Sequence, residues 1–478
     1  MSDFVYHCQM ENLKIFRVFQ VLNRKEAESI IEHFSLPYYI DKQPKMALLV
    51  KFLLKIKNNQ LTTTKEEMFH AAFGNEIYDD LKFRHLCSEV TERVISILIR
   101  DKLALKKIES NLALLAWYQD NRLEKDYISL KKDIGTLIYN NKFQDIQTYW
   151  DKYNYYLFPN NFSEDRLQQN QQEQLSVASD NLDIYYMSKK LQMAAEMITL
   201  KKVSSATYDI RFIDEIINIV ENTELLKNDL LRLYYFNLMN LHHTQKTEYF
   251  FSLKDLFIEI YVKLPSSEAR TIYYFLLNKC AVMINSGEEI WLNHIMDLYK
   301  LGLESELIYV GKYLSIWNFK NIITTTLRLK QYDYVLQLLN TQIKNLPEEH
   351  RENAYTYNMA NYYFHIKNYD KVLPLLQSVN YSELFYELDS RTLLIKTYYE
   401  THETDSLFAA IDSFSQMMRR TKRINQSRLT SYIKFIKYIK KLINAKYKRQ
   451  KARIALASEL RATTGVADKG WLLSKLQF

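Results

Sequence analysis

A tandem repeat constrains the fold of this chain more than any other feature of its sequence. Tyr332–Leu339 reads YDYVLQLL, and Tyr369–Leu376 reads YDKVLPLL at a spacing of 37 residues. A weaker copy follows 35 residues later, with Asp405 and Leu407 at the Asp and Val positions. This period is typical of helical repeats, in which each pair of helices buries its apolar face only by stacking on neighbouring pairs. The repeat therefore predicts stacked helix pairs in this part of the chain.

The composition extends the helical prediction to the whole chain. The 478 residues include only 7 Gly and 6 Pro, the residues that most often interrupt helices and form tight turns. Hydrophobic residues make up 47%, enough for a large core. We therefore expect an all-α protein in which helix covers more than two-thirds of the chain, without a substantial sheet.

The same composition argues against several classes of enzyme. P-loops and dinucleotide-binding loops need glycines at fixed spacings, and neither GxxxxGK[ST] nor GxGxxG occurs here. His294 and Asp297 have a spacing that can share a metal ion, but no second pair is nearby in the sequence. We expect no enzymatic activity, metal or cofactor; an active site assembled from distant residues remains the alternative.

The sequence also indicates where the protein resides. No run of 18 apolar residues is present, and the first 20 residues lack the apolar core of a signal peptide. Three widely spaced cysteines are typical of a reducing compartment. We expect a cytoplasmic protein with no transmembrane segment.

Four parts can be distinguished along the chain. They are an N-terminal helical module at 1–157, a polar linker or long loop at 158–180, tetratricopeptide-like helical repeats at 181–418, and basic capping helices at 419–478. A helix over part of 158–180 is an open alternative. In the first module, Asn23 with Glu26, and the run 62–64 of three threonines before Glu66 and Glu67, predict helix N-termini. Pro44 suits the first turn of another helix.

Residues 315–415 resemble tetratricopeptide repeats. The resemblance rests on small, aromatic and large apolar residues at the expected positions, namely Ala360, Tyr363, Tyr369, Val372, Leu376 and Val379. Val372 is bulkier than the usual alanine, and Pro374 falls inside the second helix, where proline costs about 3 kcal/mol. The whole chain is similar to an uncharacterised family of large helical proteins from Bacteroidota. The segments that carry this likeness are 34–39, 65–69, 83–86, 185–191 and 467–473.

The resemblance to tetratricopeptide repeats implies a peptide groove lined by the first helix of each pair. Transferred to this chain, it places six residues on one inner surface: Lys320, Thr324, Asn361, Phe364, Lys396 and Tyr399. Lysine and asparagine there would hold a carboxylate and the backbone of an acidic peptide, and the aromatic rings would pack on its side chains. Thr324 stands where repeats that clamp acidic C-termini would use a second Asn. A groove that is only solvated is the alternative.

A basic segment lies near the C-terminus. Residues 419–461 contain 15 Lys or Arg and one acid. An apolar stripe is predicted at Tyr432, Ile433, Ile436, Ile439 and Ile443, and the lysines mainly off it are Lys434, Lys437, Lys440, Lys441 and Lys448. These lysines form either the solvated face of a capping helix or a patch that binds a polyanion.

We therefore expect a non-enzymatic scaffold for protein–protein interaction, with a protein or peptide as its partner. The alternative is a nucleic-acid-associated protein that binds phosphate through the basic segment.

Overall fold

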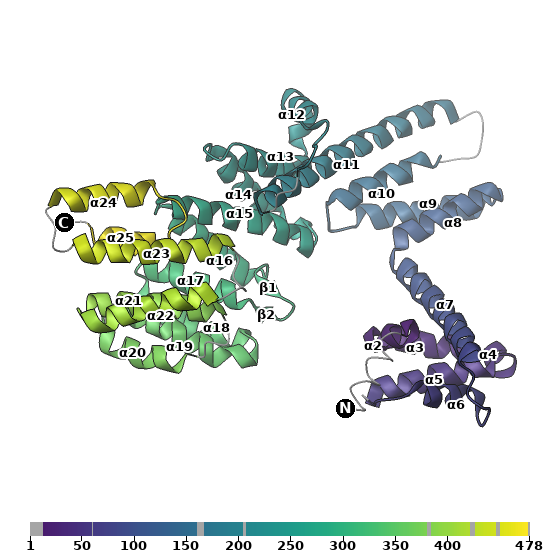
Figure 1. Cartoon of the computed structure of the whole chain (residues 1–478). Coiled ribbons are helices and arrows are strands. Elements are labelled where there is room, and N and C mark those ends of the chain that lie inside the picture. Colours follow the sequence, from purple (N-terminus) through teal and green to yellow (C-terminus); the bar gives the residue numbers. More distant parts are fainter. Residues whose placement is uncertain are drawn as a thin grey trace. The chain divides into compact units, whose positions relative to one another are not determined.

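A computed structural model describes residues 13–59, 61–159, 167–203, 207–379, 384–420, 426–445 and 450–476. The described residues are overwhelmingly helical (Figure 1). Their one sheet is a hairpin of two-residue strands, in which β1 (Tyr309–Val310) pairs antiparallel with β2 (Tyr313–Leu314). The prediction of an all-α chain without a substantial sheet is confirmed. None of the described helices combines the length and apolarity that crossing a bilayer requires.

The chain forms two compact units. One contains Met1–Asn141 and Gln147–Asp183, and the other contains Lys142–Ile146 and Ile184–Phe478. The division falls within α11 (Leu167–Val203). Because α11 covers residues 167–180, these residues are helical. This corrects the expectation of a linker or long loop there and agrees with the helical alternative. Residues 160–166 of that range lie outside the described part.

Local sequence patterns place the early helices. In chain order these are α2 (Lys14–Val21), α3 (Arg24–Phe34), α4 (Pro37–Asp41), α5 (Pro44–Asn59), α6 (Lys65–Phe73), α7 (Asp80–Leu105), α8 (Lys107–Asp120), α9 (Glu124–Tyr139) and α10 (Ile146–Leu157). Asn23 Oδ1 accepts from the Glu26 N–H at 3.0 Å, and Glu26 Oε2 accepts from the Asn23 N–H at 2.9 Å. Thr64 and Glu67 form the same reciprocal box before α6. Both predicted N-termini are confirmed, and α5 begins at Pro44.

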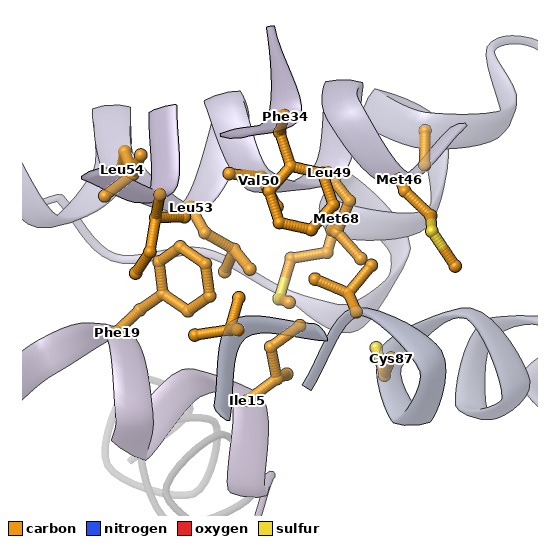
Figure 2. Packing of buried hydrophobic residues seen from close by; sticks show 14 of the residues in the cluster. Ile15, Phe19, Phe34, Met46, Leu49, Val50, Leu53, Leu54, Met68 and Cys87 are labelled. Atoms are coloured by element: carbon orange, nitrogen blue, oxygen red, sulfur yellow. The ribbon is translucent and has the colours of Figure 1, made fainter. Parts of the chain in front are cut away.

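The first helices enclose their own core. Side chains from α2, α3, α5, α6 and α7 point toward one another there, among them Phe19, Phe34, Leu53, Met68 and Cys87 (Figure 2). The buried residues of this core recur every three or four positions along each helix. Every helix therefore presents one apolar face to the shared interior.

The second unit continues from α11 as a series of helices. They are α12 (Ile213–Asn222), α13 (Asp229–His242), α14 (Glu248–Ile260), α15 (Ser266–Ser286), α16 (Trp291–Glu304), α17 (Ile316–Arg328), α18 (Tyr332–Gln342), α19 (Glu348–His365), α20 (Tyr369–Ser378), α21 (Leu384–Glu400), α22 (Thr404–Arg420), α23 (Gln426–Ala445), α24 (Gln450–Ala462) and α25 (Lys469–Ser474). Consecutive helices pack in pairs: α13 on α14, α15 on α16, α17 on α18, α19 on α20 and α21 on α22.

Three of these pairs share one turn. Lys330, Lys367 and His402 each have a left-handed backbone, with φ of 57°, 62° and 62°, and each lies two residues before the second helix of its pair. They recur at 37 and then 35 residues, the spacing of the sequence repeat. In each turn the residue after the left-handed one donates its N–H to a carbonyl five residues earlier, which is a Schellman cap.

The apolar residues of the repeated motif are buried. Val335, Leu339, Val372 and Leu376 are each 1% exposed or less, as the stacking of helix pairs requires. The helix α19 contacts α17 and α18, which precede it in the chain, and α20 and α21, which follow it. Pro374 lies inside α20, as its sequence position predicts.

The C-terminal helices pack onto the last pair. A single apolar cluster joins α21 and α22 to α23, α24 and α25, through residues that include Ile411, Phe435, Leu460 and Leu472. In Figure 1 these last helices are yellow; α23 packs on α22, and α24 and α25 pack on α23.

Candidate peptide-binding site

The six residues predicted to line a groove come from three neighbouring helices. Lys320 and Thr324 lie on α17, Asn361 and Phe364 on α19, and Lys396 and Tyr399 on α21. Each pair is three or four residues apart and so shares one face of its helix. The helix α19 contacts both α17 and α21, so the three helices are neighbours.

Lys396 is the centre of the site. The residue is only 6% exposed, and its Nζ donates to Asp468 Oδ2 at 2.9 Å. The same Nζ lies 4.7 Å from the centroid of the Phe364 ring and 5.8 Å from that of Trp471. A buried ammonium needs a counter-charge, and here it has one carboxylate and two aromatic faces.

Asp468 enters the site from the segment before α25. Its backbone is left-handed, with φ of 47°. Although 42% of the side chain is exposed, packed neighbours surround it, and this desolvation alone would raise the pKa of its carboxyl. The positive charges of Lys396, Lys320 and Arg328 outweigh that effect and bring the pKa of Asp468 below its usual value. The carboxylate is thus held as an anion by α17 and α21.

Trp471 lies one turn after Asp468 and also contacts α21. Its indole Nε1–H donates to Glu400 Oε1 at 2.9 Å, and its ring meets Tyr399 edge-on at 5.4 Å between centroids. Lys475 Nζ lies 2.5 Å from the same oxygen of Glu400. The carboxylate of Glu400 therefore receives two donors from the C-terminal segment.

Lys320 is occupied by a different acid. It forms an ion pair with Asp389 of α21, and the Tyr432 hydroxyl donates to Asp389 Oδ1 at 2.5 Å. Both charged side chains are largely buried. Lys320 is therefore not a free ligand for a peptide carboxylate, although its charge still acts on Asp468.

His365 shares this environment. Its burial, and then the positive charge of Lys396, lower the pKa of His365 to about 4, although Asp468 acts in the opposite direction. The ring is therefore neutral at physiological pH, and the site carries no additional cation from this residue.

The predicted groove residues are thus partly assembled and already covered. Lys396 and Tyr399 contact the acid and the indole of the chain's own C-terminal segment, Phe364 packs on Lys396, and Lys320 is paired with Asp389. Lys396 and Tyr399 are therefore not open to solvent as the predicted groove requires. Asn361 is buried one turn before Phe364. Among the described residues, Thr324 makes no hydrogen bond or ion pair with this cluster.

Sequence reasoning missed the acidic and indole side of the site. Asp389, Glu400, Asp468 and Trp471 were not assigned to it. Asp468 and Trp471 lie within 467–473, one of the segments singled out in the sequence, and no other signal pointed to them.

Three lysines of the basic segment make local contacts. Lys434 Nζ donates to the Thr464 carbonyl at 2.7 Å, Lys441 Nζ lies 2.6 Å from Glu459 Oε1, and Lys440 Nζ lies 3.7 Å from Asp412 Oδ1. These contacts attach α23 to α22, to α24 and to the segment that follows. Lys437 is exposed, and Lys448 lies outside the described residues.

The apolar face of α23 is close to the predicted stripe. Tyr432, Ile436 and Ile439 are buried and Ile443 is half-buried. Ile433 is 48% exposed, which corrects its assignment to the stripe. Phe435 and Tyr438 are buried instead, so the buried face is rotated toward them.

No metal-binding cluster accompanies these features. In the part of the chain that the structure describes, no three His, Cys, Asp or Glu side chains are close enough to hold an ion.

No family model, curated protein or solved structure matches the chain. The function is therefore inferred from the geometry of the chain itself.

Proposed function

We propose that this protein is a non-enzymatic scaffold for protein–protein interaction, in which tetratricopeptide-like repeats present α17, α19 and α21 to a peptide segment of a partner. The observation that carries the proposal is the engagement of Asp468 and Trp471 by Lys396 and Glu400. These contacts combine a charge-assisted hydrogen bond, an indole hydrogen bond and cation–aromatic packing, which are the interactions used in peptide recognition.

The recurring turn supports a repeat architecture. Left-handed residues at Lys330, Lys367 and His402 follow the sequence period, and α19 packs between α17 and α21. In a solenoid of helix pairs, the first helices of successive pairs lie side by side in this way and form one continuous inner face. The proposal also relates the chain to the Bacteroidota family that its sequence resembles.

A cytoplasmic location belongs to the same proposal. Cys87 and Cys280 are free thiols, both buried. Burial raises the pKa of each thiol to about 12, so neither is a reactive thiolate at neutral pH. They act as small apolar core residues, as expected in a reducing compartment.

Site-specific cross-linking tests the scaffold. A photoreactive residue placed at Asn321 on α17, or at Lys437 on α23 as the matched control, would be carried by the full chain in its native cytoplasm. Both positions are exposed. We expect one partner protein to be linked from Asn321 and not from Lys437. Linkage from Lys437 alone would contradict the proposal.

A nucleic-acid-associated protein is the second candidate. It is favoured by the 15 basic residues against one acid in 419–461, and by the exposure of Lys437. Binding through this segment would weaken steeply as salt rises, because phosphate contacts release counterions. Retention on a heparin column at low salt, abolished when Lys437, Lys440 and Lys441 are all replaced by Glu, would support it. If the protein is not retained at low salt, this second candidate is wrong, and the basic segment serves only to cap the helical repeats.

A further inference from the structure

We propose that Asp468–Trp471 is an internal ligand, and that the partner protein binds the same face with a segment in which an acidic residue precedes a tryptophan by three positions. This inference rests on the proposed function and specifies the chemistry of the partner. In this conformation the chain's own segment holds the place that the partner segment would take.

The helix α21 displays two matched recognition groups one turn apart. Lys396 and Glu400 are four residues apart on one face of the helix, and Asp468 and Trp471 are three residues apart on the segment they hold. The lysine takes the carboxylate, and the glutamate takes the indole N–H. A peptide with the acid and the tryptophan exchanged would place like charges together and leave the indole without its acceptor, so the site also has a direction.

Aromatic walls complete the site. Phe364 of α19 lies under the Lys396 ammonium, and Tyr399 meets the Trp471 ring at its edge. An acidic residue alone would use only Lys396, whereas the indole adds the contacts with Tyr399 and Glu400. The partner is therefore an acidic segment with a tryptophan rather than a generally acidic one.

The internal segment depends on these contacts for its position. The helix α25 has six residues, too few for a helix to be stable without tertiary contacts. Besides the polar contacts, Leu472 and Leu476 attach it to the apolar cluster of the C-terminal helices. Trp471 also packs against this cluster. Removing the Asp468 and Trp471 side chains would therefore weaken the hold of α21 on the internal segment, so that a free peptide that supplies both side chains could displace it.

Tethering makes the internal segment a strong competitor. A ligand on a short connection acts at an effective concentration on the order of millimolar. A free peptide with the same contacts must exceed that concentration to displace it. The wild-type chain is therefore expected to bind such a peptide much more weakly than a chain whose own segment has lost its acid and indole.

The test uses the full chain and a fluorescent peptide with the sequence of residues 464–476. Anisotropy titrations compare the wild type, the double variant Asp468→Asn with Trp471→Ala, and Ser474→Ala as a matched control on the exposed side of α25. We expect the double variant to bind the peptide at least tenfold more tightly than the wild type, and Ser474→Ala to behave as the wild type. Control peptides in which the Asp is replaced by Asn, or the Trp by Ala, should lose at least tenfold in affinity for the double variant.

Circular dichroism identifies any variant that fails to fold, and Trp471→Ala alone then replaces the double variant. Equal binding by wild type and the folded variant, or equal binding of the control peptides, would overturn the inference. The absence of binding between the folded double variant and millimolar peptide would also overturn the inference. A wild-type dimer that exchanges this segment, seen by light scattering, would show that the occupant is a second copy and not a partner protein.

The two proposals can fail separately. A partner that is cross-linked from α17 but lacks an acid three residues before a tryptophan would overturn this inference and leave the scaffold standing. Cross-linking from Asn321 is therefore repeated in the double variant, whose own segment no longer supplies the acid and the indole, and the absence of any cross-linked partner there would overturn the scaffold itself.

Discussion

At the scale of single residues, His365 couples the candidate site to pH. Its pKa is about 4 in the folded protein, because of burial and then Lys396, against about 6.5 in an unfolded chain. The unfolded state binds the proton more readily, so this contribution to stability is complete above about pH 6.5 and is lost progressively as pH falls toward 4. We expect the unfolding free energy to fall by about 1–2 kcal/mol between pH 7 and pH 5 because of this residue.

Urea denaturation at the two pH values measures the effect. His365→Gln should remove that part of the pH dependence, whereas His85→Gln, at an exposed position on α7, should leave it unchanged. Identical pH dependence in the wild type and His365→Gln would show that the histidine is not held in its neutral form.

Leu376 represents the buried positions of the repeat. It is 1% exposed and belongs to the motif shared with Leu339. Leu376→Ala should lower the unfolding free energy by about 2–5 kcal/mol, because it removes buried methyl groups and leaves a cavity. Gln377→Ala, on the exposed side of α20, should change it by less than about 0.5 kcal/mol. Equal melting temperatures for the two variants would contradict the packing described here.

At the scale of elements, the shared turn predicts a stabilising substitution. Lys330 has φ of 57°, a conformation that costs a residue with a Cβ roughly 1–2 kcal/mol and glycine almost nothing. Lys330→Gly should therefore stabilise the protein by about 1 kcal/mol, after the larger entropy of glycine in the unfolded chain is included. Gln337→Gly, in the exposed interior of α18, should instead destabilise it by about 1 kcal/mol. Thermal unfolding measures both, and destabilisation by Lys330→Gly would contradict the assigned turn.

Element boundaries were predictable where the determining residues are adjacent in sequence. The caps at Asn23 and Thr64 are patterns of four residues, and the period of the repeat identified Leu376 as buried. The position of Ile433 was not predictable, because it lies at the edge of a stripe whose direction depends on which helices cover α23. The helical part of 158–180 was obscured by its polar composition, although glutamine, frequent there, is a good helix former.

At the scale of the whole molecule, two units imply two unfolding events. The core around Leu53 lies in one unit, and the core around Leu376 lies in the other. Leu53→Ala should lower the protection of α5 and α7 amides against hydrogen exchange while leaving α19 and α21 unchanged, and Leu376→Ala should do the reverse. Equal loss of protection throughout the chain after either substitution would indicate one cooperative unit.

Long-range pairing was the part of the site that sequence could not predict. The predicted groove grouped six residues of α17, α19 and α21, and only Phe364, Lys396 and Tyr399 among them belong to the cluster around Asp468 and Trp471. The partner of Lys396 is 72 residues away, and no local pattern indicates that α25 returns to α21. Only the fold supplies that connection, and with it the occupant of the site.

A double-mutant cycle on Lys396 and Asp468 tests the central claim most directly. The unfolding free energies of the wild type, Lys396→Met, Asp468→Asn and the double variant give the coupling between the two side chains. We predict a coupling of about 1–2 kcal/mol, below the largest known values because Asp468 is partly exposed. Additivity within about 0.5 kcal/mol would contradict the account, because it would mean that α21 does not hold the C-terminal segment through this acid.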